Sequence, residues 1–173
     1  MDQKNNSNTS LFLMELIIAV FFFSLCAAVC VRLFFASHKM AEKTVNLNNA
    51  VTWSESLAET FTSTNGDIKE LGKFYPTAVV SDNSLILFFD ENWDFLAGDS
   101  ENASYEAILN TKIMPADDVY LDVAKYDIRL KGNSVICDIK IVDVRNVSNA
   151  LLEIDDDDPA IIHSISVDTY IGE

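Results

Sequence analysis

The chain has 173 residues, enough for one membrane segment and one globular domain, and 27 acidic against 12 basic residues give it a net charge of −15. This balance argues against nucleic-acid binding, which needs clustered Lys and Arg, and it disfavours binding to anionic lipid surfaces. Three scattered cysteines are too few for a disulfide framework, and the common metal-binding and nucleotide-binding motifs are absent from the sequence, so no cofactor is expected.

The first two segments of the chain differ sharply in polarity. Residues 1–10 are polar, and the sequence predicts a leader or a cytoplasmic tail that does not fold by itself. Residues 11–36 are apolar apart from Glu15 and Arg32, and as a helix they reach roughly 39 Å, more than a hydrocarbon core of roughly 30 Å. A secretory signal peptide has a shorter apolar region of about 7–15 residues. The sequence therefore favours an uncleaved transmembrane helix, with membrane lipid as a partner, over a signal peptide.

The helix is expected to continue beyond the membrane. Residues 37–61 contain no Pro or Gly, and apolar residues recur there at spacings of three and four: Leu47, Ala50, Val51, Leu57, Ala58 and Phe61. Asn65-Gly66 supplies a stop signal, because Gly tolerates the left-handed conformation that a helix C-terminus often needs. The sequence thus predicts an amphipathic extension over residues 37–65.

Residues 66–173 show the patterns of a β-rich domain. Alternating or short apolar runs predict strands over 74–80, 84–90, 105–114, 120–130, 134–144, 151–154 and 161–171. Lys131-Gly132-Asn133 is the clearest hairpin signal and would join the strands at 120–130 and 134–144. Three aromatic residues are expected to pack in the core: Trp53, Trp93 and Phe95. The predicted fold class is α+β: a long N-terminal helix, membrane-spanning in its first half and amphipathic in its second, packed on an antiparallel sheet with one wet face.

Glu15 is the residue that bears most on function. A carboxylate within an apolar run costs about 2.5–3.5 kcal/mol at the centre of a bilayer and less near the interface, so its presence needs a reason. Two reasons concern this chain alone: Glu15 could reach the headgroups, or it could favour the positive end of the helix dipole. A capping box fits poorly, because with Ser10 as N-cap the acid would be expected at position 13, which is Leu13.

The stretch from Ser10 to Val20, SLFLMELIIAV, resembles the type IV prepilin signature, in which a hydrophilic leader is cut before an apolar segment whose fifth residue is Glu. By position, the resemblance implies cleavage by a prepilin peptidase between Ser10 and Leu11 and methylation of Leu11. It also implies that Glu15 neutralises the terminal amine of a neighbouring subunit. In lipid, an unpaired carboxylate and an unpaired ammonium are both costly, and a partner in register relieves both. The family usually has Gly and Phe where this chain has Ser10 and Leu11.

The resemblance implies a pilin-like or pseudopilin-like subunit of a type IV pilus, a type II secretion system or a DNA-uptake filament, without enzymatic activity. Its partners would be other pilin-like subunits, and its β domain would lie outside the cytoplasm, at the cell membrane or in an extracellular filament. The positive-inside rule alone gives the opposite orientation, because the basic residues gather at and after the C-terminal end of the apolar run: Arg32, Lys39 and Lys43. The alternative function is a membrane-anchored β-rich domain that binds a ligand or senses a signal, with the helix as a tether.

The remaining polar and sulfur-containing residues carry weaker signals. Asp155–Asp158 could be a calcium loop, but it lacks the spaced ligands and internal Gly of a known loop, which favours a solvated acidic turn. His38 and His163 have no Ser or Cys at a suggestive spacing, so no catalytic site is predicted. Cys26 and Cys30, one helical turn apart, are expected to face lipid or another helix, and palmitoylation or a contact across subunits stays open.

Overall fold

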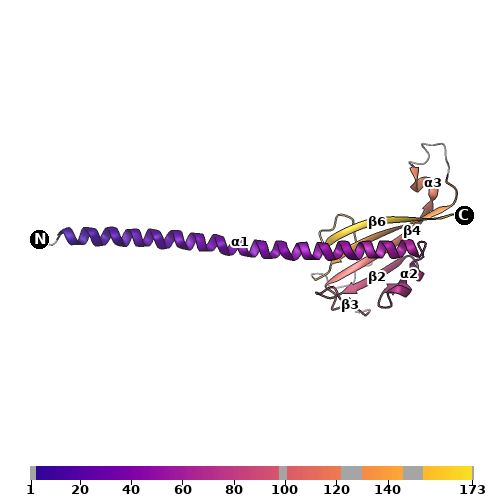
Figure 1. The fold of residues 1–173 in the computed structure, drawn as a ribbon, viewed down its shortest axis with the longest axis horizontal. Coiled ribbons are helices and arrows are strands. Elements are labelled where there is room, and N and C mark those ends of the chain that lie inside the picture. Colours follow the sequence, from indigo (N-terminus) through magenta and orange to yellow (C-terminus); the bar gives the residue numbers. More distant parts are fainter. Residues whose placement is uncertain (1–2, 98–100, 122–129, 146–153, 173) are drawn as a thin grey trace. The chain divides into compact units, whose positions relative to one another are not determined.

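The computed structural model describes residues 3–97, 101–121, 130–145 and 154–172, with side chains from Ser10 onward. Within these residues, three helices and six strands follow one another (Figure 1): α1 (Gln3–Ser63), α2 (Ile68–Phe74), β1 (Val79–Val80), β2 (Ser84–Phe89), β3 (Phe95–Leu96), β4 (Tyr105–Pro115), α3 (Ala116–Val119), β5 (Asn133–Asp143) and β6 (Ile161–Gly172). The chain divides into two compact units, residues 1–45 and residues 46–173. The predicted α+β class, a long N-terminal helix packed on an antiparallel sheet, is confirmed.

Helix α1 begins earlier than the sequence indicated. Residues 1–10 were expected not to fold by themselves, but the described part of this segment, from Gln3, continues the helix of the apolar run. Once a helix is nucleated, each further residue adds a backbone hydrogen bond, so even polar residues of low helix propensity can join its end. As predicted, α1 then runs on without interruption past the apolar run, to Ser63.

The end of α1 is a Schellman motif, close to the predicted stop signal. The Gly66 amide donates a hydrogen bond to the Phe61 carbonyl at 3.0 Å, and the Asn65 amide donates to the Thr62 carbonyl at 3.1 Å. These bonds satisfy carbonyls that the last turn would otherwise leave free. Asn65 and Gly66 both have positive φ, 52° and 78°. Asn65 therefore occupies the left-handed cap position, and Gly66 follows it in the same region.

Replacing Gly66 by alanine is expected to destabilise the β domain by more than about 1 kcal/mol, because a Cβ is disfavoured at positive φ. That Cβ would also lie 3.0 Å from the Cβ of Val135. Gly172→Ala is the matched control: its φ is +71°, but the nearest atom to a new Cβ, on Tyr170, is 3.9 Å away. Chemical denaturation of the two variants in detergent measures the difference, and equal midpoints would contradict the steric contribution of Val135.

The segment after α1 corrects one prediction. A short strand was expected over 74–80, but Phe74 is the last residue of helix α2, and only Val79–Val80 pairs with β2. Asp67 begins α2, because its carboxylate accepts hydrogen bonds from two amides of the first turn, at 2.8 and 3.2 Å. The signal for this helix was an Asp N-cap followed by the buried pair Ile68 and Leu71, spaced by three.

The strands form one antiparallel sheet in the order β1-β2-β4-β5-β6. Strand β3 also pairs with β2; β1 pairs with the first half of β2 and β3 with its last residues, while β4 pairs with β2 along its whole length. Four predicted strands are confirmed to within one residue at each end, namely β2, β4, β5 and β6. Strand β3 was not predicted.

The hairpin expected at Lys131-Gly132-Asn133 is wrong in its pairing. Strand β5 pairs with β4 on one side and with β6 on the other, so neither edge of β5 is left for a strand over 120–130. Residues 122–129 lie outside the described residues, as do 151–153 of the strand predicted over 151–154. Gly132 does turn the chain, with a φ of 95°. The Lys-Gly-Asn sequence located the turn and alternation located the strand after it, but neither pattern shows which strands are neighbours.

The main core lies between the sheet and the last part of α1. Ala50, Leu57 and Phe61 are fully buried on one stripe of the helix. They pack against the inner face of the sheet, whose buried residues include Leu85, Leu87, Phe89, Ala107, Leu109, Cys137, Ile139 and Ile141. The packed stripe is shorter than the amphipathic extension predicted over 37–65, because residues 37–45 and Leu47 are exposed.

An aromatic cluster closes one side of this core. The rings of Trp53, Trp93 and Phe95 lie around Phe89, with centroid distances of 5.2, 5.8 and 5.2 Å. Trp93 also stacks on Tyr105 at 4.2 Å. Of the three aromatic residues predicted for the core, Trp93 is buried and Trp53 is half-buried against it, whereas Phe95 contacts Phe89 but is 40% exposed.

The face of the sheet that points away from α1 is only partly exposed to solvent. Ile108, Val142 and Val144 form a second, smaller buried cluster, and Ala103, Ile154, Ala160 and Ile161 pack against it. Strand β2 is buried from Leu85 to Phe89 on both faces. The sequence predicted one wet face because it could not show that chain segments from outside the strands cover this side.

Candidate functional site

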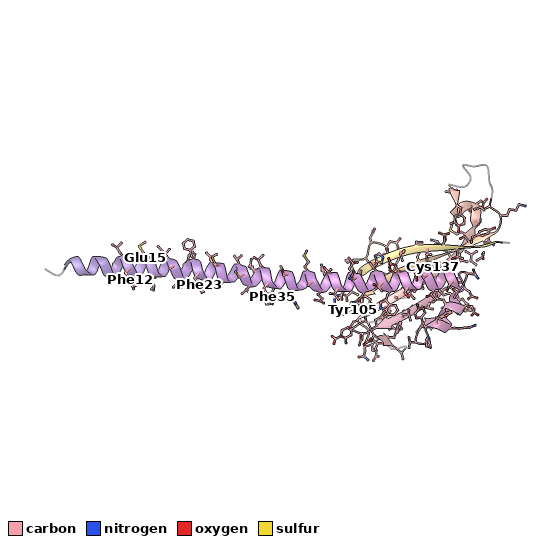
Figure 2. The ribbon with its side chains drawn as sticks, viewed as in Figure 1. Phe12, Glu15, Phe23, Phe35, Tyr105 and Cys137 are labelled. Carbon is pink, nitrogen blue, oxygen red and sulfur yellow. The ribbon has the colours of Figure 1, made fainter. Side chains whose placement is uncertain are left out.

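The residues predicted for processing and assembly lie on α1. Ser10, Leu11 and Glu15 are all exposed, and no residue from 10 to 36 is buried. Figure 2 shows the side chains of this part of the helix, including Glu15, projecting outward along its length. The large apolar residues between Leu11 and Phe35 are exposed by 46% to 76%. Soluble proteins rarely expose apolar surface on this scale, so the segment requires lipid or another protein around it.

By length and composition, α1 can cross a membrane. Its most apolar window of 18 residues has a mean hydropathy of 2.6, and none of that window is buried. About 20 apolar residues are enough to span the hydrocarbon core. Within the described part of the chain this is the single candidate span, which is consistent with a single-pass membrane protein.

Two charges of opposite sign interrupt the apolar segment. Glu15 and Arg32 are exposed, and neither has a hydrogen-bond or ion-pair partner among the described side chains. They are 17 residues apart, which is about 25 Å along a helix, so they cannot pair with each other in one copy. In lipid, each charge must reach the headgroups or find a partner on another chain.

Comparisons of the chain with protein-family models, with curated proteins and with solved structures found no match. The roles implied for Ser10, Leu11 and Glu15 therefore depend on the resemblance of one short stretch and on the chemistry of the helix.

The three cysteines are free thiols in two different surroundings. Cys26 and Cys30 are exposed on α1, and Cys137 is buried in β5. Burial, followed by the charge of the neighbouring Asp138, raises the pKa of the Cys137 thiol to about 12. This thiol is therefore protonated at neutral pH, and it serves as a small apolar core residue.

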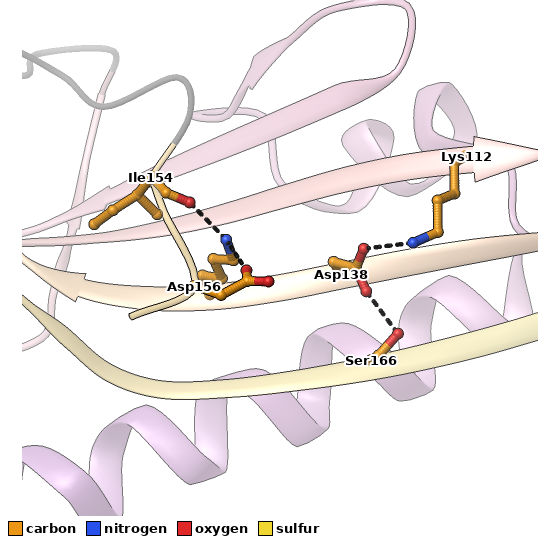
Figure 3. Close-up of polar contacts among 6 residues, drawn as sticks. Lys112, Asp138, Ile154, Asp156 and Ser166 are labelled. Atoms are coloured by element: carbon orange, nitrogen blue, oxygen red, sulfur yellow. Dashed lines mark hydrogen bonds and ion pairs between the residues drawn. The ribbon is translucent and has the colours of Figure 1, made fainter. Parts of the chain in front are cut away.

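A row of polar contacts crosses the sheet face opposite α1 (Figure 3). The Nζ of Lys112 lies 3.2 Å from Oδ2 of Asp138, whose Oδ1 accepts a hydrogen bond from Ser166 at 2.6 Å. The Nζ of Lys140 donates to the Ile154 carbonyl at 2.7 Å and lies 2.7 Å from Oδ1 of Asp156. Only 15% of the Lys140 side chain is exposed. The row ties β4, β5, β6 and the turn before β6 together, and its partners satisfy one another.

Asp155–Asp158 form an acidic turn. The Asp158 amide donates to the Asp155 carbonyl at 3.1 Å, and Oδ1 of Asp158 accepts a hydrogen bond from the Ala160 amide at 2.8 Å. Asp156 is directed to Lys140. Of the residues described, no three His, Cys, Asp or Glu side chains are grouped so as to hold a metal ion. The calcium-loop alternative thus gains no ligand set from the fold.

Asp156 makes the stability of this turn dependent on pH. The hydrogen bond from Lys140 lowers the pKa of the Asp156 carboxyl below its ordinary value. A lowered folded-state pKa contributes stability above the unfolded value of about 3.9, and the contribution is lost as the pH falls through the folded pKa. We expect Asp156→Asn to lower the melting temperature at pH 7 slightly, and the difference from wild type to vanish once the pH is well below the folded pKa of Asp156. Asp157→Asn, which changes an exposed acid of the same turn, is the control; an equal shift there would show a general charge effect.

A cleft of about 370 Å³ lies beside the turn between α1 and α2, and no pattern in the sequence pointed to it. Lys69 and Lys112 line it, and each is engaged, Lys69 with Asp82 at 3.0 Å and Lys112 with Asp138. Because separate segments of the chain form the cleft, a local pattern could not have predicted it.

The two histidines do not add a site: His38 is exposed on α1, and His163 lies on β6 opposite Ile141.

Proposed function

We propose that the chain is a pilin-like or pseudopilin-like subunit that assembles into a filament through the exposed part of α1. The supporting observation is the length of the exposed apolar surface. Beyond the apolar run, apolar side chains recur between polar ones, and three of them, Met40, Val45 and Leu47, are exposed by 72%, 58% and 45%. From Leu11 to Leu47 the helix measures about 55 Å, whereas the hydrocarbon core is about 30 Å thick. Lipid can cover the apolar run, and the helices of neighbouring subunits can cover both this run and the exposed apolar side chains beyond it.

Assembly of this kind needs no active site. In the bilayer, lipid tails solvate the apolar side chains as well as another helix would, so packing and polar pairs have to select the neighbour. Glu15 supplies that selection, because its carboxylate is costly in an apolar surrounding until a cation of a neighbouring subunit meets it. The mechanism is mechanical: a subunit exchanges lipid for the helices of the filament, and its β domain is displayed at the surface.

The resemblance adds the other partners. A prepilin peptidase would cut between Ser10 and Leu11, and the β domain would lie outside the cytoplasm. A type IV pilus, a type II secretion system and a DNA-uptake apparatus would all accommodate such a subunit. Intact mass and N-terminal sequencing of the native protein test the processing step, with a start at Leu11 expected; a retained Met1 would contradict it.

Exchange of the span distinguishes assembly from tethering. A chain in which residues 11–36 are replaced by an unrelated apolar segment of the same length is expected to reach the membrane but to be missing from sheared filaments. The wild-type chain, expressed to the same level, is the control for both membrane insertion and incorporation. Normal incorporation of the exchanged chain into polymer would overturn the proposal and favour an anchored binding or sensory domain.

A further inference from the structure

We infer that Arg32 of a second copy is the partner of Glu15, so that copies of α1 pack side by side with a stagger of 17 residues. This inference rests on the proposed filament function and names the contact that builds it. Glu15 and Arg32 are the two charged residues of the segment 11–36, they are opposite in sign, and both are exposed. A guanidinium can hold a carboxylate through two parallel hydrogen bonds, which makes Arg the most specific partner that this segment offers.

The positions of the two residues around α1 determine how copies can repeat. Each residue turns the helix by about 100°, so 17 residues place Glu15 and Arg32 about 25 Å apart along the axis and about 100° apart around it. One copy can therefore present Glu15 to one neighbour and Arg32 to a different neighbour. A contact that joins two different surfaces and does not close on itself generates an open helical filament.

The stagger couples this contact to departure from the membrane. Copies at equal depth in the bilayer hold Glu15 and Arg32 at different levels, about 25 Å apart, and cannot join them. A rise of one copy by that distance brings the two charges level, and it is close to the hydrocarbon thickness of about 30 Å. The ion pair thus stabilises a copy that has moved out of the bilayer relative to its neighbour, and it does not stabilise side-by-side copies within the bilayer.

The surroundings of the two charges fit the same stagger. Residues 11–28 of one copy would lie along residues 28–45 of the next. Lys39 and Lys43 share the Arg32 side of α1, since they follow it by 7 and 11 residues, and they extend a positive stripe toward the copy that carries Glu15. Phe22 and Cys26 share the Glu15 side by the same spacing and would meet the apolar stems of these lysines, whose ammonium groups can reach solvent.

A charge exchange in the full-length chain tests the pair. Glu15→Arg and Arg32→Glu are each expected to reduce sheared, sedimentable polymer at least tenfold, and the double exchange is expected to restore it. Membrane insertion of every variant is checked by resistance to alkaline extraction. If the single variants lose polymer and the double does not regain it, the pair is overturned while the proposed function survives, with Glu15 meeting another cation such as a terminal amine. If the wild-type chain itself enters no polymer, the proposed function fails and the pair fails with it.

Oxidative cross-linking tests the register with Glu15 and Arg32 left in place. In a Cys30→Ser background, Lys43→Cys is expected to form an intermolecular disulfide with Cys26, because positions 26 and 43 are 17 apart. Ala41→Cys, on the opposite side of the helix at nearly the same level, is the control and is expected to give much less. In the unmodified chain, a disulfide between Cys26 of one copy and Cys30 of another would indicate that neighbouring helices are shifted by four residues. That shift would place Glu15 of one copy level with Leu11 of the next, and it would overturn the inference. Equal yields from positions 41 and 43 would overturn it as well.

Discussion

Replacing Glu15 by leucine is expected to abolish polymer formation and to leave membrane insertion unchanged or improved. Leucine removes the cost of a carboxylate in the apolar segment, so the variant is at least as well accommodated by lipid. It also removes a charge-assisted contact worth about 1.5–3 kcal/mol, and each 1.4 kcal/mol is about a factor of ten in a subunit equilibrium. Because the contact repeats at every subunit, the loss is multiplied along the filament. The measurement is the ratio of sheared polymer to membrane-bound chain.

Two further variants separate charge from size in that experiment. Glu15→Gln keeps the shape and a hydrogen-bonding group but loses the charge, and we expect it to fail nearly as fully as the leucine variant. Glu55→Gln, an exposed acid of α1 within the β-domain unit, is the matched control and should assemble normally. Polymer at wild-type levels from Glu15→Leu would contradict the role assigned to the carboxylate.

Replacing Phe61 by alanine is expected to lower the free energy of unfolding of the β domain by about 3–5 kcal/mol. Phe61 is fully buried, and its carbonyl accepts the Gly66 amide that closes the end of α1. The ring also lies where a Cβ on Gly66 would touch it, at 3.4 Å. Truncation therefore opens a cavity at the point where the helix, the turn after it and β5 meet.

Tryptophan fluorescence is a direct readout for this variant, because Trp53 and Trp93 lie in the aromatic cluster of the same core. Denaturation of the full-length chain in detergent gives the unfolding free energy. Leu47→Ala is the control on the same helix; Leu47 is 45% exposed, and we expect a change within about 0.5 kcal/mol. A loss below about 1 kcal/mol at Phe61 would show that its side chain does not support the core as the structure indicates.

The parts of the fold that could be predicted well from the sequence are those with long, regular patterns. The uninterrupted apolar and striped run predicted α1, and alternation predicted β4, β5 and β6 almost to the residue. The failures concern information that a local pattern does not contain. The neighbours of β5 are set by the whole sheet, so the turn at Gly132 was located but the pairing across it was wrong, and α2 was missed because seven residues show little periodicity.

In the candidate site, too, local sequence patterns predicted some features, and features that depend on the whole fold were missed. Glu15 stood out because a charge among apolar residues is visible in one dimension. In the sequence, Arg32 bore only on the orientation of the chain in the membrane. The structure shows that Arg32 and Glu15 are both exposed on one helix without a partner among the described side chains, which relates the two charges to each other. The polar row from Lys112 to Ser166 could not be predicted, since it depends on the register of three strands.

The burial of Ala50, Leu57 and Phe61 against strands that end near the C-terminus has a consequence for biosynthesis. Ile165 and Val167 of β6 complete the same core, and more than a hundred residues of chain separate them from the helix. Contacts so distant in sequence form slowly, and they cannot form until β6 has left the ribosome. Until then, the apolar part of α1 can already insert into the membrane, while the core residues of α1 are still exposed. This is the stage at which a chaperone would be needed most.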